Sequence, residues 1–464
     1  MRELAGSMAA LVLGTAALGC VSADASYADV RRLVSERTGK DVRWQARESE
    51  PRDGPARELL AKPLTADAAV QVALLDNAEV QAAFEDLGVA RSRLVQRLRL
   101  PNPSVEAALR FEGSRRPEVD LFGLLSVTDL ALLPVENGAG QARLAAAQLS
   151  VAGQVLDLAF ATRVAFYELQ AAQQVLELDR NIALALAATV EAAEALHTAG
   201  NITDLRLSSE QALYGEAQLA ATRAEALLTA RREELASLLG ISGTELHWSA
   251  EPRLASPSSA SALPNDLEAR AVERSLDLQL LRTRATAASR EANLATVRGW
   301  VPELRAGVSA ERKNDVDPAW GVGPAVSLEV PLFYQGQGER GAALADLRRQ
   351  QQREISTAAR IRARARAVGA RLRAARDSVG YYERVLLPLR QKILDDTQLE
   401  YNAMSVGVFQ LLEAKRAQIE AARGYVQLLR EFWTVRAEAD QLLAGRLPGQ
   451  SSAPSEAGED GAVR

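Results

Sequence analysis

The chain has 464 residues, of which 47% are hydrophobic, 25% are charged and 5% are aromatic. This composition, rich in Ala, Leu, Glu and Arg, favours long helices that pack lengthwise. The formal net charge of -5 gives no reason to expect nucleic acid as a partner, and the single cysteine excludes disulfides within the chain as a source of stability.

Residues 1–20 are predicted to be a signal peptide. A charged start precedes an apolar run, Met8–Leu18, that is too short to span a bilayer. The run ends in Ala17-Leu18-Gly19-Cys20, which resembles a bacterial lipobox and predicts lipidation of Cys20. Ala23-Asp24-Ala25 is an alternative cleavage site, and cleavage there leaves Cys20 without a role. Both interpretations predict export.

The middle of the chain repeats itself. Leu100-Pro101-Asn102-Pro103 is echoed by Val301-Pro302-Glu303-Leu304, and Gly138-Ala139-Gly140 by Gly336-Gln337-Gly338. Each copy has roughly 200 residues, far more than a solenoid repeat, so we infer a duplicated unit. The predicted parts are a periplasmic linker (21–60) with one short helix near Tyr27–Glu36, a first repeat (61–248), an inter-repeat linker (249–263), a second repeat (264–446) and a disordered tail (447–464).

Each half is predicted to contain one continuous and one broken helical strut. The continuous helices run from about Gly140 to Ala199 and from about Glu339 to Met404, and each is about 90–95 Å long. Pro388 is expected to bend the second of them. The broken struts are Thr65–Leu98 with Thr203–Leu239, and Asp266–Gly299 with Val408–Leu443.

No segment after the signal peptide is predicted to cross a membrane as a helix, because Arg, Glu or Asp interrupts every long apolar stretch. Alternating apolar and polar residues instead predict lipid-facing strands with charges on the inner face. Aromatic residues near the strand ends are typical of a membrane interface. The predicted strands are Val105–Glu112, Leu121–Leu133, Leu304–Glu311 and Val322–Leu332, and in Leu121–Leu133 apolar residues occupy both faces. The aromatic residues are Phe111, Trp300, Trp320, Phe333 and Tyr334.

Four strands cannot close a membrane barrel, because an open edge in lipid leaves backbone groups unpaired. The strands therefore predict oligomerisation, with the twelve strands of a trimer as the obvious solution. The alternative is a small soluble sheet made of two packed hairpins.

At the far ends of the long helices the chain turns back twice, at Ala199–Leu205 and at Met404–Leu412. Glycine is expected to end each rising helix, at Gly200 and at Gly407. Thr203 or Asp204 is expected to cap the first descending helix. We expect these two tips to point away from the strands.

The whole constellation, over roughly residues 60–445, resembles the TolC-like outer-membrane factors of tripartite efflux systems. The resemblance rests on the Pro-led strands, the Gly-marked tips, the duplication and the strand-to-helix transitions. These transitions are placed at Pro134 and Gly138 in the first half, and at Pro331 and Gly336 in the second. The lipoprotein-like start resembles the drug-exporting and heavy-metal-exporting members.

This resemblance implies a mainly α-helical fold with a small β part. Long antiparallel helices would form a trimeric tunnel in the periplasm, and four strands per protomer would join a shared twelve-stranded barrel in the outer membrane of a Gram-negative bacterium. It also implies partners, namely outer-membrane lipid, a periplasmic adaptor and an inner-membrane pump. The residues carried over to adaptor docking and gating are Gly200, Asp204, Leu205, Gly407, Leu411, Leu412 and Glu413.

Our leading hypothesis is a passive exit duct whose tips open when an adaptor binds. It would conduct small molecules or metal ions that an inner-membrane pump exports. The alternative is an exported, lipid-anchored coiled-coil scaffold without a pore. Such a scaffold has no use for alternating strands that are bounded by aromatic residues.

Other motifs do not indicate chemistry. Gly336–Gly341 fits GxGxxG, but the helix after it is far too long for a dinucleotide site and no parallel strand returns. The Arg-rich stretch Arg360–Arg376 is interpreted as a solvated helix face. His197 and His247 lack partners at metal-ligand spacing. We therefore predict no catalytic residue, no cofactor and no metal site.

Overall fold

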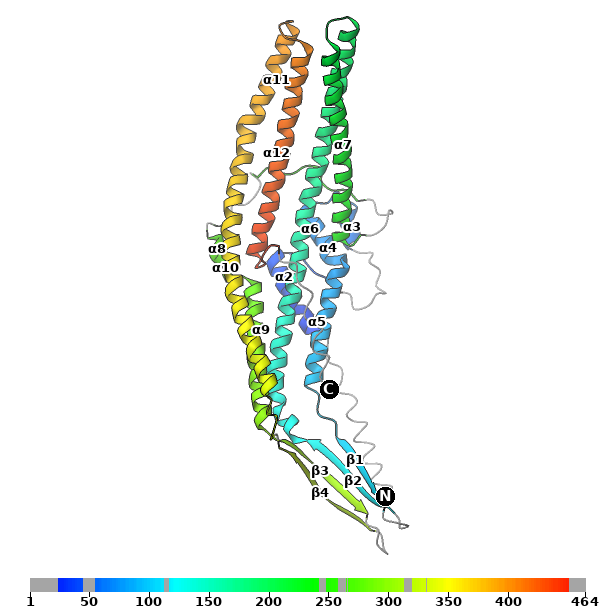
Figure 1. The fold of residues 1–464 in the computed structure, drawn as a ribbon, viewed down its shortest axis with the longest axis vertical. Coiled ribbons are helices and arrows are strands. Elements are labelled where there is room, and N and C mark those ends of the chain that lie inside the picture. Colours follow the sequence, from blue (N-terminus) through cyan, green and yellow to red (C-terminus); the bar gives the residue numbers. More distant parts are fainter. Residues whose placement is uncertain are drawn as a thin grey trace.

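The computed structural model describes residues 24–44, 55–111, 117–241, 248–257, 264, 266–312, 319–330 and 332–449. The molecule is long and narrow, with a four-stranded sheet at one end and two helical tips at the other (Figure 1). Cys20, His247, Pro331 and the hairpin residues between the strands lie outside the described residues. The end of the tail from residue 450 also lies outside them.

The elements follow one another in two similar halves. The first half contains α2 (Asp24–Thr38), α3 (Pro55–Leu60), α4 (Ala66–Asp76), α5 (Ala78–Arg97), β1 (Ser104–Arg110), β2 (Glu118–Ser126), α6 (Val127–Thr198) and α7 (Asp204–Leu239). The second half contains α8 (Leu267–Glu273), α9 (Leu276–Trp300), β3 (Glu303–Arg312), β4 (Trp320–Glu329), α10 (Gln337–Tyr381), the π-helical turn η3 (Tyr382–Leu386), α11 (Leu387–Asn402) and α12 (Val408–Leu443).

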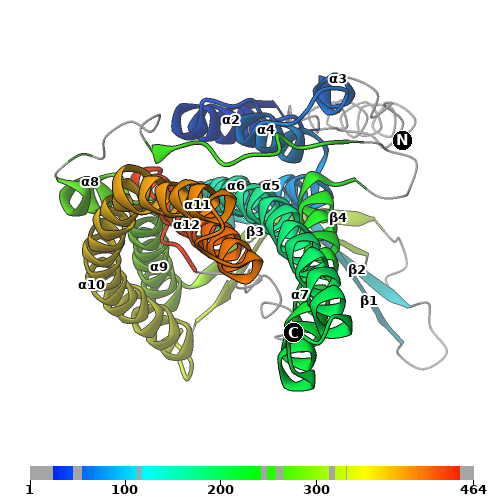
Figure 2. The ribbon, with the colours of Figure 1, turned by 90° about the horizontal axis from the view of Figure 1, so that it is seen from above.

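The helices lie side by side in the same order as the strands that they join. The strands are antiparallel in the order β1-β2-β3-β4. In the chain, α5 leads into β1, β2 into α6, α9 into β3 and β4 into α10, and the helices contact one another in the order α5, α6, α9, α10. The protomer is therefore one continuous layer. Seen from above, that layer is curved, and α2, α3 and α4 lie on its convex side (Figure 2).

The predicted pairing of continuous and broken struts is observed. Helix α6 is continuous, and its neighbours α5 and α7 form the broken strut beside it (Figure 1). In the second half, α10, η3 and α11 run on without a gap, beside α9 and α12. The π-helical turn ends two residues before Pro388, so the irregularity lies where proline was expected to disturb the helix.

Two equivalent breaks, which the sequence did not predict, divide the helices that lead into β1 and β3. Asn77 separates α4 from α5, and Ser275 separates α8 from α9; each caps the helix that follows. At each break the chain leaving a descending helix packs closely through a glycine with positive φ. An added Cβ on Gly240 would lie 2.8 Å from the Asp76 carbonyl oxygen, and one on Gly445 would lie 2.3 Å from that of Arg274. Only glycine fits these contacts.

The second strand and the first long helix differ from their expected bounds. The predicted strand Leu121–Leu133 ends at Ser126, because Ser126 Oγ accepts a hydrogen bond from Asp129 N–H at 3.1 Å and starts α6. Pro134 and Gly138 consequently lie inside α6, and not at a strand-to-helix transition. Apolar residues on both faces of this segment suit a buried helix start as well as a strand.

One expectation about membrane-spanning helices was too strict. Helix α6 contains an 18-residue window with a mean hydropathy of 1.4, which by length and composition alone would suit a bilayer. Half of that window is buried inside the protein, since α6 contacts α7, α12, α9 and α5. Packing within the layer therefore accounts for its apolar character.

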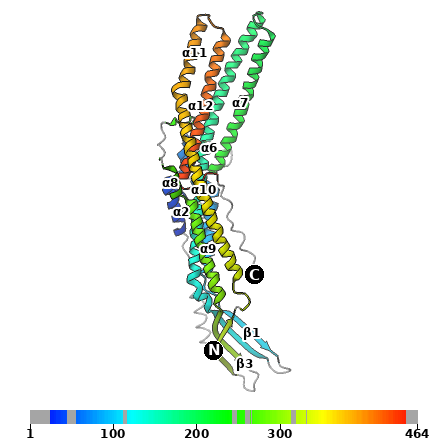
Figure 3. The same ribbon diagram turned by 60° about the vertical axis from the view of Figure 1, so that its left-hand side comes forward.

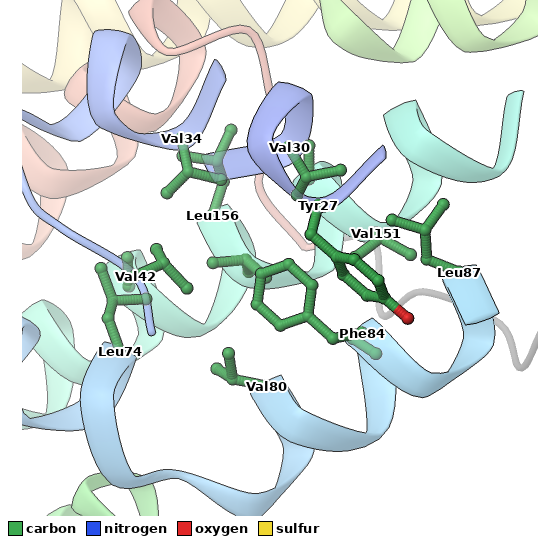
Figure 4. Close-up of a cluster of buried hydrophobic side chains, with 14 of the residues drawn as sticks. Tyr27, Val30, Val34, Val42, Leu74, Val80, Phe84, Leu87, Val151 and Leu156 are labelled. Carbon is green, nitrogen blue, oxygen red and sulfur yellow. The ribbon is translucent and has the colours of Figure 1, made fainter. Parts of the chain in front are cut away.

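The N-terminal segment is part of the core, whereas residues 21–60 were expected to form a polar linker. Tyr27, Val30 and Val34 of α2 are buried against α5 and α6 (Figure 4). The Tyr27 ring stacks on Trp44 with centroids 4.0 Å apart, and it lies 6.0 Å from Phe84. Burial of these large side chains holds α2 on the first repeat.

Candidate functional site

The first tip joins α6 to α7 in a hydrogen-bonded turn. Gly200 has φ +75°, its N–H donates to the His197 carbonyl at 2.8 Å, and Asn201 N–H donates to the Leu196 carbonyl at 2.8 Å. This pattern ends a helix on a left-handed glycine, as expected. Thr203, and not Asp204, caps α7, because its Oγ1 accepts a hydrogen bond from Arg206 N–H at 3.3 Å.

Asp204 closes this turn from the side. His197 Nε2 and Asp204 Oδ1 are 2.6 Å apart, so the last turn of α6 is tied to the first turn of α7. The Asp204 side chain is otherwise exposed, and the neighbouring Leu205 has 78% of its surface exposed. The tip therefore presents a carboxylate and an apolar side chain to its surroundings.

The second tip uses a different residue for the same turn. Met404, with φ 58°, takes the left-handed position that Gly200 holds in the first tip, and Ser405 N–H donates to the Glu400 carbonyl at 2.9 Å. Gly407 has an ordinary φ of -84° and starts α12, so the expectation that Gly407 ends the rising helix was wrong. The Gly407 N–H donates to Gln410 Oε1 at 2.8 Å.

The remaining tip residues lie on the first turns of α12. Leu411 and Leu412 are half-buried, whereas Glu413 is exposed. The two tips end separately (Figure 3), but one side chain bridges them. The Arg206 guanidinium lies 4.9 Å from the centre of the Phe409 ring, and Arg206 also pairs with buried Glu210 at 2.8 Å. The sequence did not single out this contact.

The opposite end of the molecule is a sheet with two chemically different faces. The strand register places residues from all four strands on one face that is almost entirely apolar, and charged residues gather on the other. The apolar face contains Val105, Ala107, Leu109, Val119, Leu121, Leu125, Leu304, Ala306, Val308, Ala310, Val322, Val326 and Leu328. The opposite face contains Glu106, Arg110, Glu118, Asp120, Glu303, Arg305, Glu311 and Glu329.

None of the described segments covers the apolar face in the protomer. Val322 and Val326 are more than 70% exposed, and Leu328 is more than half exposed. A continuous exposed apolar face of this kind marks a surface that meets lipid or another protein. The alternation predicted for the first, third and fourth strands is thus observed in the register of β1, β3 and β4, whereas β2 carries apolar residues on both faces.

Side chains and close backbone contacts fix the passage from sheet to helix. Thr128 Oγ1 donates to the Pro302 carbonyl at 2.9 Å and accepts from Leu304 N–H at 2.8 Å, which joins α6 to β3. Gly336, with φ +72°, caps α10 as the predicted transition residue. An added Cβ on Gly299 would lie 1.9 Å from the Gln335 carbonyl oxygen, so this crossing also requires glycine.

A buried charge cluster joins the two halves at mid-height. Arg446 is 7% exposed and Asp277 is 6% exposed. The Arg446 guanidinium donates hydrogen bonds to both Asp277 and Asp157 of α6. Burial disfavours the charged guanidinium, but the hydrogen bonds and charges of the two carboxylates outweigh this effect and raise the pKa of Arg446. Sequence separations of 169 and 289 residues hide this cluster from pattern analysis.

The described residues contain no group of three or more His, Cys, Asp or Glu side chains able to hold a metal ion. His197 is engaged with Asp204 at the first tip. The glycines of the GxGxxG match surround the start of α10, where Gly338 packs against Tyr334. In this part of the chain they serve the strand-to-helix crossing.

Comparisons with known proteins agree with this architecture. The chain is similar to the cobalt-zinc-cadmium resistance protein CzcC of Cupriavidus metallidurans, with 22% identity over 395 residues, which span 82% of this chain and 90% of that protein. The outer membrane protein VceC of Vibrio cholerae has a similar structure, with a TM-score of 0.64 and 16% identity over 82% of this chain and 96% of VceC. No protein-family model matches the chain.

A third similar structure is the MtrE outer membrane channel of Neisseria gonorrhoeae, with a TM-score of 0.65 and 15% identity over 84% of this chain and 89% of MtrE. The helical layer, the sheet and these similarities define the fold of an outer-membrane channel. The predicted class of long helices with four strands is confirmed, as is the resemblance to TolC-like channels at the level of the fold.

Proposed function

We propose that the protein is the outer-membrane exit duct of a tripartite efflux system in a Gram-negative bacterium. The two-faced sheet carries this proposal. Its apolar face suits lipid and its charged face suits a water-filled lumen, and both continue into a helical layer that reaches the two tips. A coiled-coil scaffold without a pore would leave the apolar face unexplained.

The relatives support the same function. CzcC is a cobalt-zinc-cadmium resistance protein, and MtrE is an outer membrane channel. We carry over from them the passive export of metal ions or small molecules through a continuous duct. Because the described residues hold no metal-ligand cluster, a metal ion would pass as cargo and would not be retained.

The two side edges of the layer support a homotrimer. One edge consists of β1, α5 and α7, and the other consists of β4, α10 and α11. Each edge strand carries unpaired backbone groups that lipid cannot satisfy. If β4 of one copy pairs with β1 of the next, three copies close a ring of twelve strands, which meets the minimum for a membrane barrel.

Helix α7 carries a coiled-coil seam that no described residue of the protomer covers. Apolar or small residues recur along it with heptad spacing, and all of them are exposed. Facing it around the ring would be η3 and α11 of the next copy, with exposed Val385 on η3 and exposed Leu389 and Leu399 on α11. The α7 seam consists of Leu205, Ser208, Ala212, Gly215, Leu219, Thr222, Ala226 and Thr229.

Aromatic side chains mark the expected membrane boundaries. Trp300, Phe333 and Tyr334 lie where the sheet meets the helices and are 72%, 95% and 58% exposed. Phe111 and Trp320 lie at the other end of the strands and are also exposed. Two such levels suit the two interfaces of an outer membrane. A lipid on Cys20 would add a further anchor and belongs to the same proposal.

The tips would dock a periplasmic adaptor that is linked to an inner-membrane pump. Exposed Leu205, the tied carboxylate Asp204 and the exposed Glu413 offer an adaptor apolar and acidic contacts. Leu411 and Leu412, with the turn residues Gly200 and Gly407, would shape this surface. Gating would consist of a movement of the α11–α12 pair away from the α6–α7 pair, which breaks the contact between Arg206 and Phe409.

Conductance in a planar lipid bilayer tests this function. The purified protein should form ion-conducting pores, and substitution of Arg206 by Ala should raise their open fraction because the contact between the tips is lost. Arg180→Ala is the matched control, because Arg180 of α6 forms an exposed ion pair with Glu225 of α7 and does not join the two tips. A protein that inserts into the bilayer but never conducts would contradict the duct.

A further inference from the structure

A recess of about 330 Å³, partly open to solvent, lies where α2, α4, α6, α12 and the α8–α9 break meet. Three arginines from different parts of the chain line it, namely Arg37 at the end of α2, Arg163 on α6 and Arg274 between α8 and α9. The recess lies far from both the tips and the sheet, and the proposed duct makes no use of it.

Two of the charges at this recess are already neutralised. Arg163 donates to Asp67 Oδ1 at 2.7 Å. Asp440 is the acidic residue that lines the recess, and Arg436 Nε donates to both of its oxygens at 3.1 and 3.2 Å. Arg163 lies 4.0 Å from Asp440 and reinforces this network. These four groups balance one another.

Arg37 and Arg274 find no such compensation among the described residues. The Arg37 Nη1 atom is buried and donates no hydrogen bond to any part of the chain that the structure describes. Burial lowers the pKa of Arg37, and the nearby charge of Arg274 lowers it further, more strongly than the adjacent Glu36 raises it. Two like charges beside a recess, one of them with a buried unpaired donor, cost free energy unless an anion lies between them.

We propose that this recess binds an oxyanion, either a phosphate or a carboxylate group. A guanidinium presents paired N–H donors that match the oxygens of these groups, and burial strengthens such bonds. The volume exceeds what one such group needs, and it lies at the lower end of the range for small-ligand sites. The bound group would link α2 to the second repeat and so hold the N-terminal helix in place.

The oxyanion could come from solution or from the chain itself. Ala444 lines the recess, and the chain leaves this region through Leu447 toward a tail that carries Glu456, Glu459 and Asp460. Both sources use the same chemistry, so the experiment must separate them. Inorganic phosphate serves as the free probe, and a full-length variant with the three tail acids changed to Gln or Asn removes the internal source.

The measurement is the thermal unfolding midpoint of the full-length protein in detergent, with phosphate exchanged for chloride at constant ionic strength. We expect a saturable rise of the midpoint, because a ligand that binds only the folded state stabilises it. Arg37→Gln should raise the half-saturating phosphate concentration by about tenfold or more, because one charge-assisted hydrogen bond to the anion is lost. Arg274→Gln serves as a second site variant.

Arg31→Gln is the matched control, since Arg31 lies on the same helix, is exposed and carries the same charge. It should keep the phosphate response. A response that appears only in the tail variant would assign the site to a tail carboxylate. An absence of response in both backgrounds, or equal responses in the Arg37 and Arg31 variants, would overturn the oxyanion site. Neither result bears on conductance, so the duct is tested separately.

Discussion

Arg446 and Asp277 form a buried pair that ties the end of α12 to the start of α9. The Arg446 guanidinium donates to Asp277 Oδ1, and Leu447 N–H donates to the second oxygen of Asp277 at 2.8 Å. Asp157 of α6 accepts from the same guanidinium, so one arginine joins both repeats. An added Cβ on Gly153 would lie 2.8 Å from this guanidinium, which keeps position 153 free of a side chain.

Removal of Arg446 should destabilise the protein strongly. Arg446→Ala leaves the carboxylates of Asp157 and Asp277 near one another without their cation, which costs about 3–5 kcal/mol. The thermal unfolding midpoint in detergent measures the loss. Arg253→Ala, which breaks an exposed pair with Glu177, should cost about 1 kcal/mol or less. Similar midpoints for both variants would contradict a central role for the buried cluster.

Asp179 should make the protein more stable as the pH falls. This side chain of α6 is 2% exposed, and Arg423 lies 3.2 Å away. Its oxygens accept no hydrogen bond from the described residues. Burial raises the pKa of Asp179, and the attraction of Arg423 only partly offsets this. The folded state thus binds the proton more tightly than the unfolded state, whose aspartate pKa is about 3.9.

Stability should consequently rise as the pH falls through the raised pKa toward the unfolded value, and this component should vanish in Asp179→Asn. At neutral pH the variant should unfold no earlier than the parent chain, because the half-exposed Arg423 can reach water. Unfolding midpoints between about pH 4 and 7 test the sign. A variant that is destabilised at neutral pH and keeps the full pH dependence would refute this account.

The two faces of the sheet should tolerate charge differently. Leu328 lies on the apolar face and Ser327 on the charged face of the same strand. Leu328→Arg places a charge toward lipid one residue from the end of β4, where the cost lies between about 0–1 kcal/mol at the interface and about 2–4 kcal/mol at the centre of the bilayer, and it should reduce the amount assembled in the outer membrane. Ser327→Arg faces the lumen and should assemble normally. Equal yields of the two variants in membrane fractions would count against a barrel.

Met404 is strained in its turn and should benefit from substitution by glycine. A side chain at φ 58° costs about 1–2 kcal/mol, part of which the greater freedom of unfolded glycine offsets. Met404→Gly should therefore stabilise the second tip by about 0.5–1 kcal/mol. Slower hydrogen exchange at the amides of Met404 to Gly407 would report this gain. The complementary change Gly200→Met should speed exchange at the first tip.

The α7 seam should decide assembly without affecting the protomer. Leu219 is 49% exposed at the centre of the seam, so Leu219→Glu costs the protomer little but places a charge in the proposed interface. The fraction of trimer in detergent should fall. Gln218→Glu, at the exposed neighbouring position outside the seam, should leave the trimer intact. Loss of the trimer in both variants would indicate a general charge effect.

Much of the fold follows from local patterns in the sequence. The alternation of apolar and polar residues in Leu304–Glu311 and Val322–Leu332 predicts β3 and β4, because successive residues of a strand point to opposite faces of the sheet. The long helices and the first tip follow from apolar spacing and from Gly200 in the same way. The end of β2 was misplaced, since apolar residues on both faces of Leu121–Leu133 fit a strand or a helix equally well.

The features that patterns missed depend on contacts between distant residues. The break at Asn77 is fixed by its side-chain amide, which donates to the Leu238 carbonyl at 2.8 Å. The burial of Tyr27 requires the surfaces of α5 and α6, and the Arg446 cluster requires three elements at once. The left-handed Met404 is set by the turn geometry, whereas Gly407 offered the more obvious signal.

The most direct test of the central claim is the mass and location of the unboiled, detergent-extracted protein from a Gram-negative host. We expect a heat-modifiable trimer in the outer-membrane fraction, because only a closed ring of strands satisfies the edges of β1 and β4 in lipid. A monomer or dimer that salt releases without detergent would contradict the barrel, and with it the duct.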